Sequence, residues 1–231
     1  MGSVTGRGVL EGAFGLLEAV REAQEAGLTA LAAETGLPKA TTHRLLEQLV
    51  SLGAVERHRG RYRIGPRMFR LGHGWQPHPR LRAAAQGPIR ELAAATGASV
   101  GVCVLRDHLT IVVSGVGGEA EPLVSMRPGS TYPWSTAAGK VLMANVGPDV
   151  PLGPLPASWQ RVSAQIREDD IAFDHEEVIP GISCVAVPLR DRSGDTIAAL
   201  CVVVTRSGSL SRLADLTRQV GRFVGAGLGG R

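Results

Sequence analysis

The sequence has few cysteines and no long hydrophobic run, and each shortage excludes a class of protein. No stretch reaches the roughly 20 uninterrupted apolar residues that a membrane span requires. Residues 1–7 lack the apolar core of a secretory signal, so we expect a cytoplasmic chain with no membrane partner. Cys103, Cys184 and Cys201 are an odd number and lie in apolar runs, which favours reduced, buried thiols over a disulfide framework.

Sites for a metal or a nucleotide cofactor are also missing from the sequence. Four of the six histidines are scattered at His43, His58, His73 and His78, without a metal-ligand spacing to cysteine. No phosphate-binding P-loop and no Gly-x-Gly-x-x-Gly motif is present. We therefore expect neither a metal nor a cofactor. A length of 231 residues fits one large domain or two small ones.

Positive charge is concentrated in one part of the chain. Residues 39–82 contain ten Lys or Arg against two Glu, a local charge of +8 in a chain whose formal charge is +4. Such a block beside near-neutral sequence is the electrostatic pattern of a phosphate-binding surface. The alternative is an ordinary solvated face, and the local structure must decide between the two.

Three helices are predicted before and within this block. The first covers residues 9–26, and the apolar spacing of Leu10, Ala13, Phe14, Leu17 and Val20 gives it one buried face. Thr29 is expected to cap a second helix that ends at Gly36. A third helix runs from Lys39 to Gly53.

The third helix has two chemically different faces. At 100° per residue one face is expected to be buried and consists of Thr42, Leu45, Leu46, Leu49 and Leu52. The opposite face presents small, polar and basic groups, namely Ala40, His43, Arg44 and Glu47, with Lys39 at its edge. A helix of this kind can enter the major groove of DNA.

A basic hairpin follows the third helix. Residues 55–58 and 61–64 alternate as strands and flank Arg59-Gly60, a tight-turn signal. Three helices and a basic two-stranded wing predict a winged helix-turn-helix. Alternatively, the wing arginines serve only to protect the edges of the hairpin from pairing with other strands. We expect His43, Arg44 and Lys39 to read bases, and a second group to bind phosphates, namely Thr29, Thr41, Arg57, Arg59 and Arg61.

The rest of the chain predicts a second domain, with the boundary near residue 78, giving domains at 1–78 and 79–231. A helix over residues 81–94 is followed by strands and helices in α+β order. The expected strands cover residues 99–105, 109–113, 121–126, 184–189 and 196–205. Ser135 or Thr136 can cap a helix, and residues 210–228 form a closing helix. Together they predict an antiparallel sheet flanked by helices.

Motifs occur at residues 28–29, 36–46 and 60–66 in the first domain, and at residues 126–129, 136–140, 173–177 and 180–188 in the second. In this order they resemble the IclR family of bacterial transcription regulators. Ala40-Thr41 stands where the family usually has a Ser-Thr pair, and Gly12 where it often has arginine. Both departures remove possible phosphate contacts.

The resemblance implies a GAF-like effector domain with a small-molecule pocket. By that likeness the pocket is lined by Ala137, Ala138, Asp174, Ile182, Cys184, Cys201 and Val203. The N–H groups of the helix near Ser135 favour a ligand carboxylate. The alternative to a pocket is that these residues have only structural roles, as part of a capped helix, a solvated acidic turn and buried core cysteines. Cys201 and Val203 replace hydroxyl residues and Trp134 replaces a usual histidine, which argues for an aromatic or hydrophobic acid, or for no effector. Residues 147–170 are expected to form a shortened loop.

The combined prediction is a DNA-binding transcription regulator, more a repressor than an activator. It would bind a pseudo-palindromic, double-stranded operator as a homodimer or a dimer of dimers and respond to a small effector. One alternative is a regulator without an effector, whose second domain serves only assembly. A remote alternative is a hydrolase with Cys184, His175 and Asp174, although no nearby motif lowers the pKa of that cysteine. We expect no enzyme.

Overall fold

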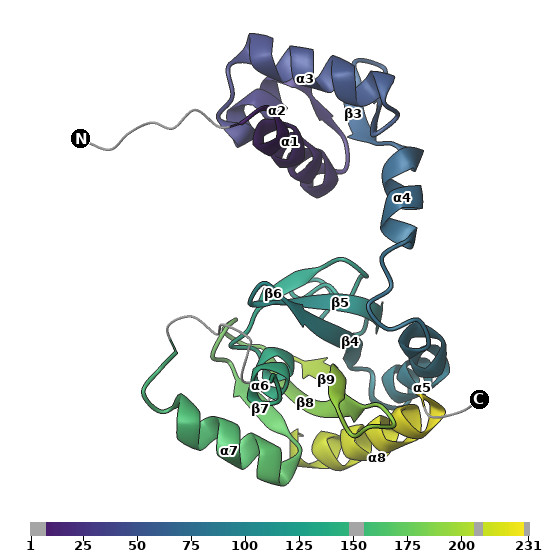
Figure 1. Cartoon of the computed structure of the whole chain (residues 1–231), viewed down its shortest axis with the longest axis vertical. Coiled ribbons are helices and arrows are strands. Elements are labelled where there is room, and N and C mark those ends of the chain that lie inside the picture. Colours follow the sequence, from purple (N-terminus) through teal and green to yellow (C-terminus); the bar gives the residue numbers. More distant parts are fainter. Residues whose placement is uncertain (1–7, 148–154, 206–209, 229–231) are drawn as a thin grey trace. The chain divides into compact units, whose positions relative to one another are not determined.

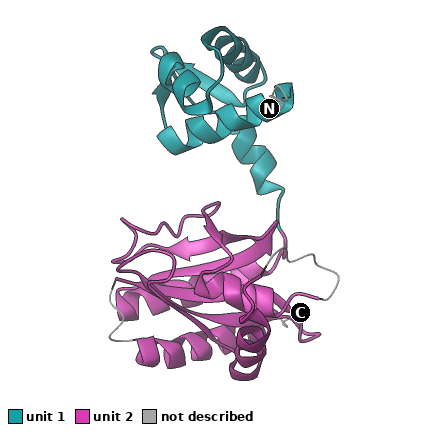
Figure 2. Cartoon of the chain, turned by 90° about the vertical axis from the view of Figure 1, so that its left-hand side faces the viewer, with its two compact units in different colours: residues 1–76 teal, residues 77–231 magenta. Residues whose placement is uncertain are grey.

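A computed structural model describes residues 8–147, 155–205 and 210–228, and the chain divides into two compact units after Gln76. Figure 2 colours residues 1–76 and 77–231 separately. No helix in the described ranges is long and apolar enough to cross a membrane.

The first unit combines three helices and a small antiparallel sheet, followed by a short fourth helix (Figure 1). Its sheet has the strand order β1-β3-β2. Its core is one cluster of aliphatic residues closed by Tyr62, which is 1% exposed. The elements are α1 (Val9–Ala23), β1 (Ala26–Gly27), α2 (Leu28–Thr35), α3 (Lys39–Ser51), β2 (Val55–His58), β3 (Arg61–Ile64) and α4 (Pro66–His73).

Four predictions for these helices are wrong in detail. Leu10 and Phe14 are 76% and 61% exposed, because α1 turns Leu16 toward the core together with Leu17 and Val20, which are buried as predicted. Helix α1 also ends at Ala23, since residues 26–27 pair with β3.

The other two corrections concern capping and the end of α3. Helix α2 begins two residues earlier than expected, with Gly27 as its N-cap, so Thr29 lies inside the first turn and caps nothing. Leu52 lies after the last residue of α3 and is 54% exposed, whereas Thr42, Leu45, Leu46 and Leu49 are buried as predicted.

The second unit has a six-stranded antiparallel sheet with helices on both faces, which confirms the predicted α+β class. The strand order is β6-β5-β4-β9-β8-β7. Helices α5 and α8 pack on one face, and α6 packs on the other with α7 beside it. The elements are α5 (Leu81–Thr96), β4 (Ser99–Arg106), β5 (Leu109–Val116), β6 (Thr131–Pro133), α6 (Ala137–Ala144), α7 (Trp159–Asp169), β7 (Ala172–His175), β8 (Ser183–Arg190), β9 (Thr196–Val204) and α8 (Leu210–Leu228).

Side-chain alternation along the strands separates two cores. Val100, Val102 and Val104 of β4 face α5 and α8, whereas Cys103 faces α6. Helix α8 comes so close to β8 that a Cβ on Gly221 would lie 2.7 Å from Val187 Cγ2.

Two segments of this unit differ from the sequence-based prediction. Residues 121–126 form turns rather than a strand, because the Glu121 carboxylate accepts hydrogen bonds from the Met126 N–H (2.9 Å) and the Ser125 hydroxyl (3.1 Å). The predicted loop at 147–170 contains α7, which is anchored by the edge-to-face contact of Trp159 with Trp134 (centroids 5.1 Å apart). Residues 148–154 of that prediction lie outside the described residues.

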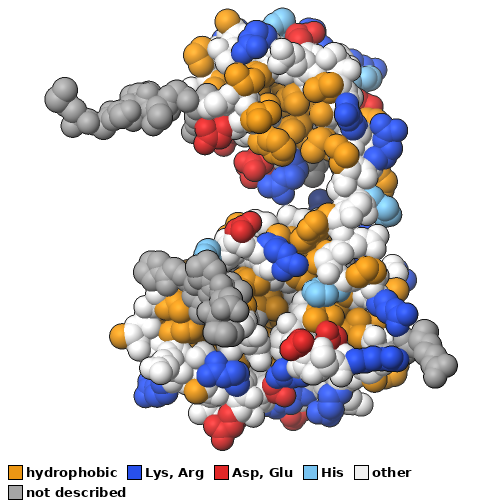
Figure 3. Space-filling model, in the orientation of Figure 1, with side chains coloured by type: hydrophobic (Ala, Val, Ile, Leu, Met, Phe, Trp, Pro, Cys, Tyr) orange, Lys and Arg blue, Asp and Glu red, His pale blue; other side chains and the backbone are white. Residues whose placement is uncertain are grey.

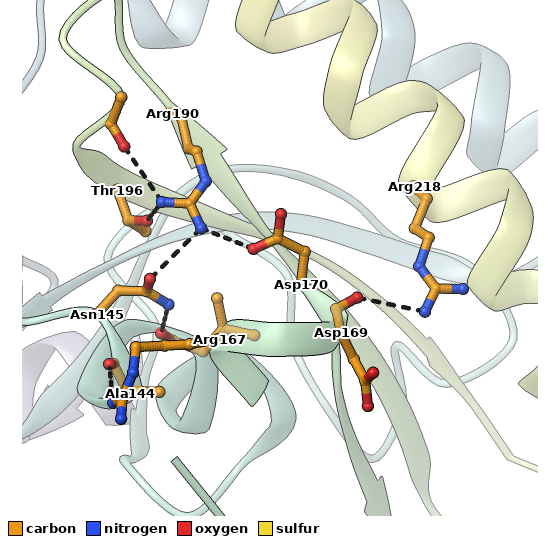
Figure 4. A network of polar contacts seen from close by, with 10 residues as sticks. Ala144, Asn145, Arg167, Asp169, Asp170, Arg190, Thr196 and Arg218 are labelled. Carbon is orange, nitrogen blue, oxygen red and sulfur yellow. Dashed lines mark hydrogen bonds and ion pairs between the residues drawn. The ribbon is translucent and has the colours of Figure 1, made fainter. Parts of the chain in front are cut away.

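A polar network joins the ends of α6 and α7 to the sheet (Figure 4). The Arg190 guanidinium of β8 lies 2.6 Å from Asp170 Oδ1, 3.0 Å from Thr196 Oγ1 and 3.5 Å from Asn145 Oδ1. Arg167 of α7 donates to the Ala144 carbonyl at 2.8 Å. Charge-assisted hydrogen bonds of this kind hold α6 in place above the sheet.

Candidate nucleic-acid interface and ligand cavity

Helix α3 presents a polar, basic face to solvent. Its buried side is fixed by Thr42, whose hydroxyl donates to the Pro38 carbonyl at 3.1 Å, and by three leucines. On the other side Thr41 is half-buried, and the exposed residues are Lys39, Ala40, His43, Arg44 and Glu47. The structure therefore places all three predicted base-reading residues on one accessible surface.

The hairpin after α3 has the turn that its sequence predicts. Strands β2 and β3 pair from Val55↔Ile64 to His58↔Arg61, leaving a two-residue loop. Arg59 and Gly60 both have positive φ, 49° and 79°, as a type I′ turn requires. Tyr62 anchors the hairpin in the core, so the turn projects Arg59 into solvent.

The wing arginines differ in their partners. Arg57 Nη1 lies 3.5 Å from Glu47 Oε1, and Arg61 Nε lies 3.9 Å from Glu25 Oε2. Both ion pairs are exposed and hold their side chains only weakly. Arg61 also donates to the Glu25 carbonyl at 2.8 Å. Among the described residues, the side chains of Lys39, Arg44 and Arg59 find no hydrogen-bond or ion-pair partner.

The remaining predicted phosphate contacts are the two threonines. Thr29 is exposed in the first turn of α2, and Thr41 lies half-buried in α3. Gly12 is buried, and a Cβ there would lie 3.4 Å from Leu45 Cδ1, so this position faces α3. The DNA-contacting roles remain predictions.

A cavity lies between α6 and its face of the sheet. Six of the seven predicted pocket residues line it, namely Ala138, Asp174, Ile182, Cys184, Cys201 and Val203. Ala137, the first residue of α6, is buried but does not line it. Sequence reasoning missed eight further lining residues, Cys103, Thr110, Val124, Met126, Tyr132, Thr136, Val178 and Ile179.

Strand alternation explains the floor of this cavity. Five adjacent strands, β5, β4, β9, β8 and β7, each contribute one residue with a polar or thiol group, in the order Thr110, Cys103, Cys201, Cys184 and Asp174. All five are at most 6% exposed. Two-residue alternation along the predicted strands would have identified Cys103 as a residue that lines the cavity. Thr110 could be assigned to the cavity only from the pairing order of the strands.

The polar groups of the cavity are held in different ways. Asp174 Oδ1 accepts the Glu177 N–H at 2.8 Å, and Lys140 Nζ lies 2.6 Å from Glu177 Oε2. Burial raises the pKa of Asp174, and the Glu177 N–H and Lys140 oppose this rise. Thr110 Oγ1 has no hydrogen-bond partner in the structure. The Thr136 hydroxyl accepts the Gly139 N–H at 3.2 Å, which confirms Thr136 as the cap of α6.

The hydrolase arrangement does not form. Asp174 and His175 are consecutive in β7, so their side chains point to opposite faces, and the His175 ring stacks on Phe173 with centroids 5.7 Å apart. A hydrogen bond with Cys201 and burial raise the pKa of Cys184. Among the described residues, no group of three His, Cys, Asp or Glu could hold a metal ion.

A winged helix-turn-helix with a basic exposed face, followed by an α+β unit with an internal cavity, defines a DNA-binding regulatory protein. Residues 9–59 match the family model of the IclR helix-turn-helix domain, and residues 156–221 match that of the bacterial transcriptional regulator IclR C-terminal domain. The chain belongs to the IclR family of DNA-binding transcriptional regulators and is not an enzyme.

Relatives of known function agree with this assignment, and a solved structure shares the fold. The glycerol operon regulatory protein of Streptomyces coelicolor is 31% identical over 87% of this chain and 89% of its own length. The transcriptional repressor IclR of Escherichia coli is 28% identical over 87% and 79%. An IclR homolog from Microbacterium hydrocarbonoxydans, complexed with 4-hydroxybenzoate, shares the fold with a TM-score of 0.81 and 20% identity over 96% of this chain and 99% of that one.

Proposed function

We propose that this regulator represses transcription in the cytoplasm by binding a pseudo-palindromic operator as a homodimer or a dimer of dimers, and that a small effector in the second unit changes this binding. The observation that carries the proposal is the exposed basic face of α3 beside a type I′ wing. His43, Arg44 and Lys39 would read base edges, while Thr29, Thr41, Arg57, Arg59 and Arg61 would contact phosphates.

Assembly is supported by an exposed apolar surface on α1. Val9, Leu10 and Phe14 are 60%, 76% and 61% exposed, and Figure 3 shows hydrophobic side chains gathered on this side of the first unit. A second copy of the chain would cover such a surface and pair two α3 helices. Two recognition helices would then meet half-sites separated by whole turns of DNA, roughly 34–36 Å for one turn.

Effector binding is supported by the chemistry of the cavity. Its walls are mainly apolar, while the unpartnered Thr110 hydroxyl and the Asp174 carboxyl supply polar contacts. The start of α6 lies beside these groups, and its N–H groups favour a carboxylate. We therefore propose an aromatic or hydrophobic acid, of the size of the 4-hydroxybenzoate bound by the Microbacterium homolog.

A regulator without an effector is the second candidate, and the size of the cavity favours it. Its volume is about 40 Å³, room for roughly three water molecules. An aromatic ring enters only if the wall side chains move. Heating the chain with candidate acids separates the two functions, because a true effector raises the unfolding temperature by mass action.

The proposed function is tested by binding to DNA upstream of the protein's own gene and its neighbours, compared with random DNA, at several salt concentrations. Selective binding that weakens with salt is expected. Equal affinity for both DNAs at every salt concentration would contradict operator recognition. The Arg44→Ala variant serves as the specificity control, since loss of a base contact should reduce operator binding more than random binding.

A further inference from the structure

Thr110 brings an unused hydroxyl to the wall of the cavity. Its side chain lines the cavity from β5 and is 1% exposed, and its Oγ1 has no hydrogen-bond partner among the described residues. Ser183 Oγ is also buried without a partner, but Ser183 does not line the cavity. An unpaired buried hydroxyl is costly, and only the one that faces a cavity can be satisfied by a ligand.

The surroundings of Thr110 determine which ligand group it can bind. Tyr132 of β6 pairs directly with Thr110, and the Tyr132 hydroxyl already donates to the Ser125 carbonyl at 2.6 Å. Among the described residues that line the cavity, Asp174 alone carries a carboxyl or an amino group, and it lies on β7, four strands from β5. A charged ligand group at Thr110 would be buried without a partner of opposite sign, so this position favours an uncharged group.

The start of α6 provides the contact for the carboxylate of the proposed acid. The Thr136 hydroxyl accepts the Gly139 N–H at 3.2 Å, and the Thr136 carbonyl accepts the Lys140 N–H at 2.8 Å. The N–H of Ala138 lies one residue earlier and has no acceptor within the helix. Both Thr136 and Ala138 line the cavity. Unused N–H groups at the start of a helix favour an anion.

These two contacts are close enough for one small ligand. The segment 132–136 joins them, because Tyr132 pairs with Thr110 and Thr136 caps α6. Fully extended, this segment spans at most about 14 Å between its terminal Cα atoms. It is shorter in the structure, because the Thr136 N–H donates to the Pro133 carbonyl at 3.3 Å. The Thr110 side chain and the Ala138 N–H both line the space between the ends, so one aromatic ring with a substituent at each end can bridge them.

Met126 is the wall residue that can make room for such a ring. A Cβ on Gly101 would lie 2.7 Å from Met126 Sδ, so the thioether fills the space above this glycine of β4. Met126 lines the cavity and is 3% exposed. A methionine side chain is unbranched and has three rotatable bonds, so it can adopt another rotamer while the backbone stays in place.

We propose that Thr110 selects the effector by binding an uncharged hydroxyl group at the end of the acid that is remote from its carboxylate. A hydroxyl group both donates and accepts, so it can use either function of the threonine hydroxyl. A methyl group at the same position would leave Thr110 unpaired. The inference rests on the proposed function, because it names the substituent that distinguishes one aromatic acid from another in the same cavity.

The test is isothermal titration calorimetry of the native full-length chain with 4-hydroxybenzoate and with 4-methylbenzoate near neutral pH. The wild-type chain should bind the hydroxy acid about tenfold more tightly. Thr110→Val should remove or reverse this preference, because the hydroxyl of the acid then becomes the unpaired group. Equal affinities in the wild-type chain, or a preference that survives in Thr110→Val, would overturn the proposal. The wild-type comparison needs no variant that has to fold.

Two further variants separate the hydroxyl from its surroundings. Thr110→Ser keeps the hydroxyl and should keep the preference for the hydroxy acid. Ser183→Ala removes the other buried, unpartnered hydroxyl, which lies outside the cavity, and should leave both affinities unchanged. Loss of the preference in Ser183→Ala as well as in Thr110→Val would mean that a general change in the unit acts, and would overturn the role of Thr110.

Failure of this inference and failure of the proposed function give different results. Equal binding of both acids by the wild-type chain would overturn the role of Thr110 and leave an acid effector. If the wild-type chain binds neither acid, the inference and the acid effector are both wrong, whereas selective binding to operator DNA would leave the regulator intact.

Discussion

Glu47 Oε1 on α3 lies 3.5 Å from Arg57 Nη1 on the wing and 3.9 Å from His43 Nε2. One exposed carboxylate thus occupies two side chains that we assign to DNA. Glu47→Gln should free Arg57 and remove a negative charge facing the phosphates. We expect DNA affinity to rise about two- to fivefold at low salt, since an exposed pair is worth at most about 1 kcal/mol. Fluorescence anisotropy of labelled DNA measures the change.

The matched control is Glu18→Gln on α1, which removes the same charge from an exposed position outside the α3 face. An equal gain in both variants would mean that only net charge acts. Unchanged or weaker binding by Glu47→Gln alone would place Arg57 outside the interface.

Arg59 is predicted to contact a phosphate without reading sequence. It lies at the tip of the type I′ turn, with φ 49°, and its side chain has no partner among the described residues. Arg59→Ala should weaken operator and random DNA about equally and reduce the salt slope of log K by about one. Arg161→Ala, an exposed arginine of α7, serves as the control. An unchanged slope would exclude Arg59 from the contact surface.

The DNA-binding unit could be predicted from sequence because its signals are local. The turn is determined by two adjacent residues, Arg59-Gly60, and the buried face of α3 by apolar residues three or four positions apart. The same apolar periodicity gave a wrong prediction for α1, because Leu10 and Phe14 have the spacing of core residues but are exposed. Apolar spacing identifies a helix face without saying whether the same chain covers it.

The cavity was predictable only in part, because its walls come from distant segments. The resemblance to a family supplied Asp174, Cys184 and Cys201, whereas Thr110 required the pairing order β5-β4-β9. A one-residue change in register would turn every side chain of a strand to the other face. Residues 121–126 looked like a strand, and only the hydrogen bonds of Glu121 show why they turn.

Two buried hydroxyls without partners should destabilise the unliganded chain. Thr110 Oγ1 and Ser183 Oγ are both unpartnered, but only Thr110 lines the cavity. Thr110→Val and Ser183→Ala should each raise the free energy of unfolding by about 1 kcal/mol, seen as a melting temperature roughly 2–4 °C higher. Only Thr110→Val should also weaken ligand binding. A lower melting temperature for both variants would mean that these hydroxyls are satisfied in solution.

The last prediction concerns Asp174 and the dependence of stability on pH. Because burial raises the pKa of Asp174 above its ordinary value of 3.8, the folded chain favours the protonated carboxyl. The stability that this proton confers is fully present below pH 3.8 and is lost as the pH rises through the folded-state pKa.

Asp174→Asn keeps an oxygen to accept the Glu177 N–H but cannot ionise, so it avoids this loss. Its melting temperature should therefore gain on the wild type as the pH is raised from about 3.5 to about 7. Asp215→Asn on α8, whose side chain is 84% exposed, controls for losing one negative charge. A gain that shrinks with rising pH would mean that the hydrogen bond from Glu177 and the charge of Lys140 outweigh burial, and that Asp174 is held as a stable anion at the wall of the cavity.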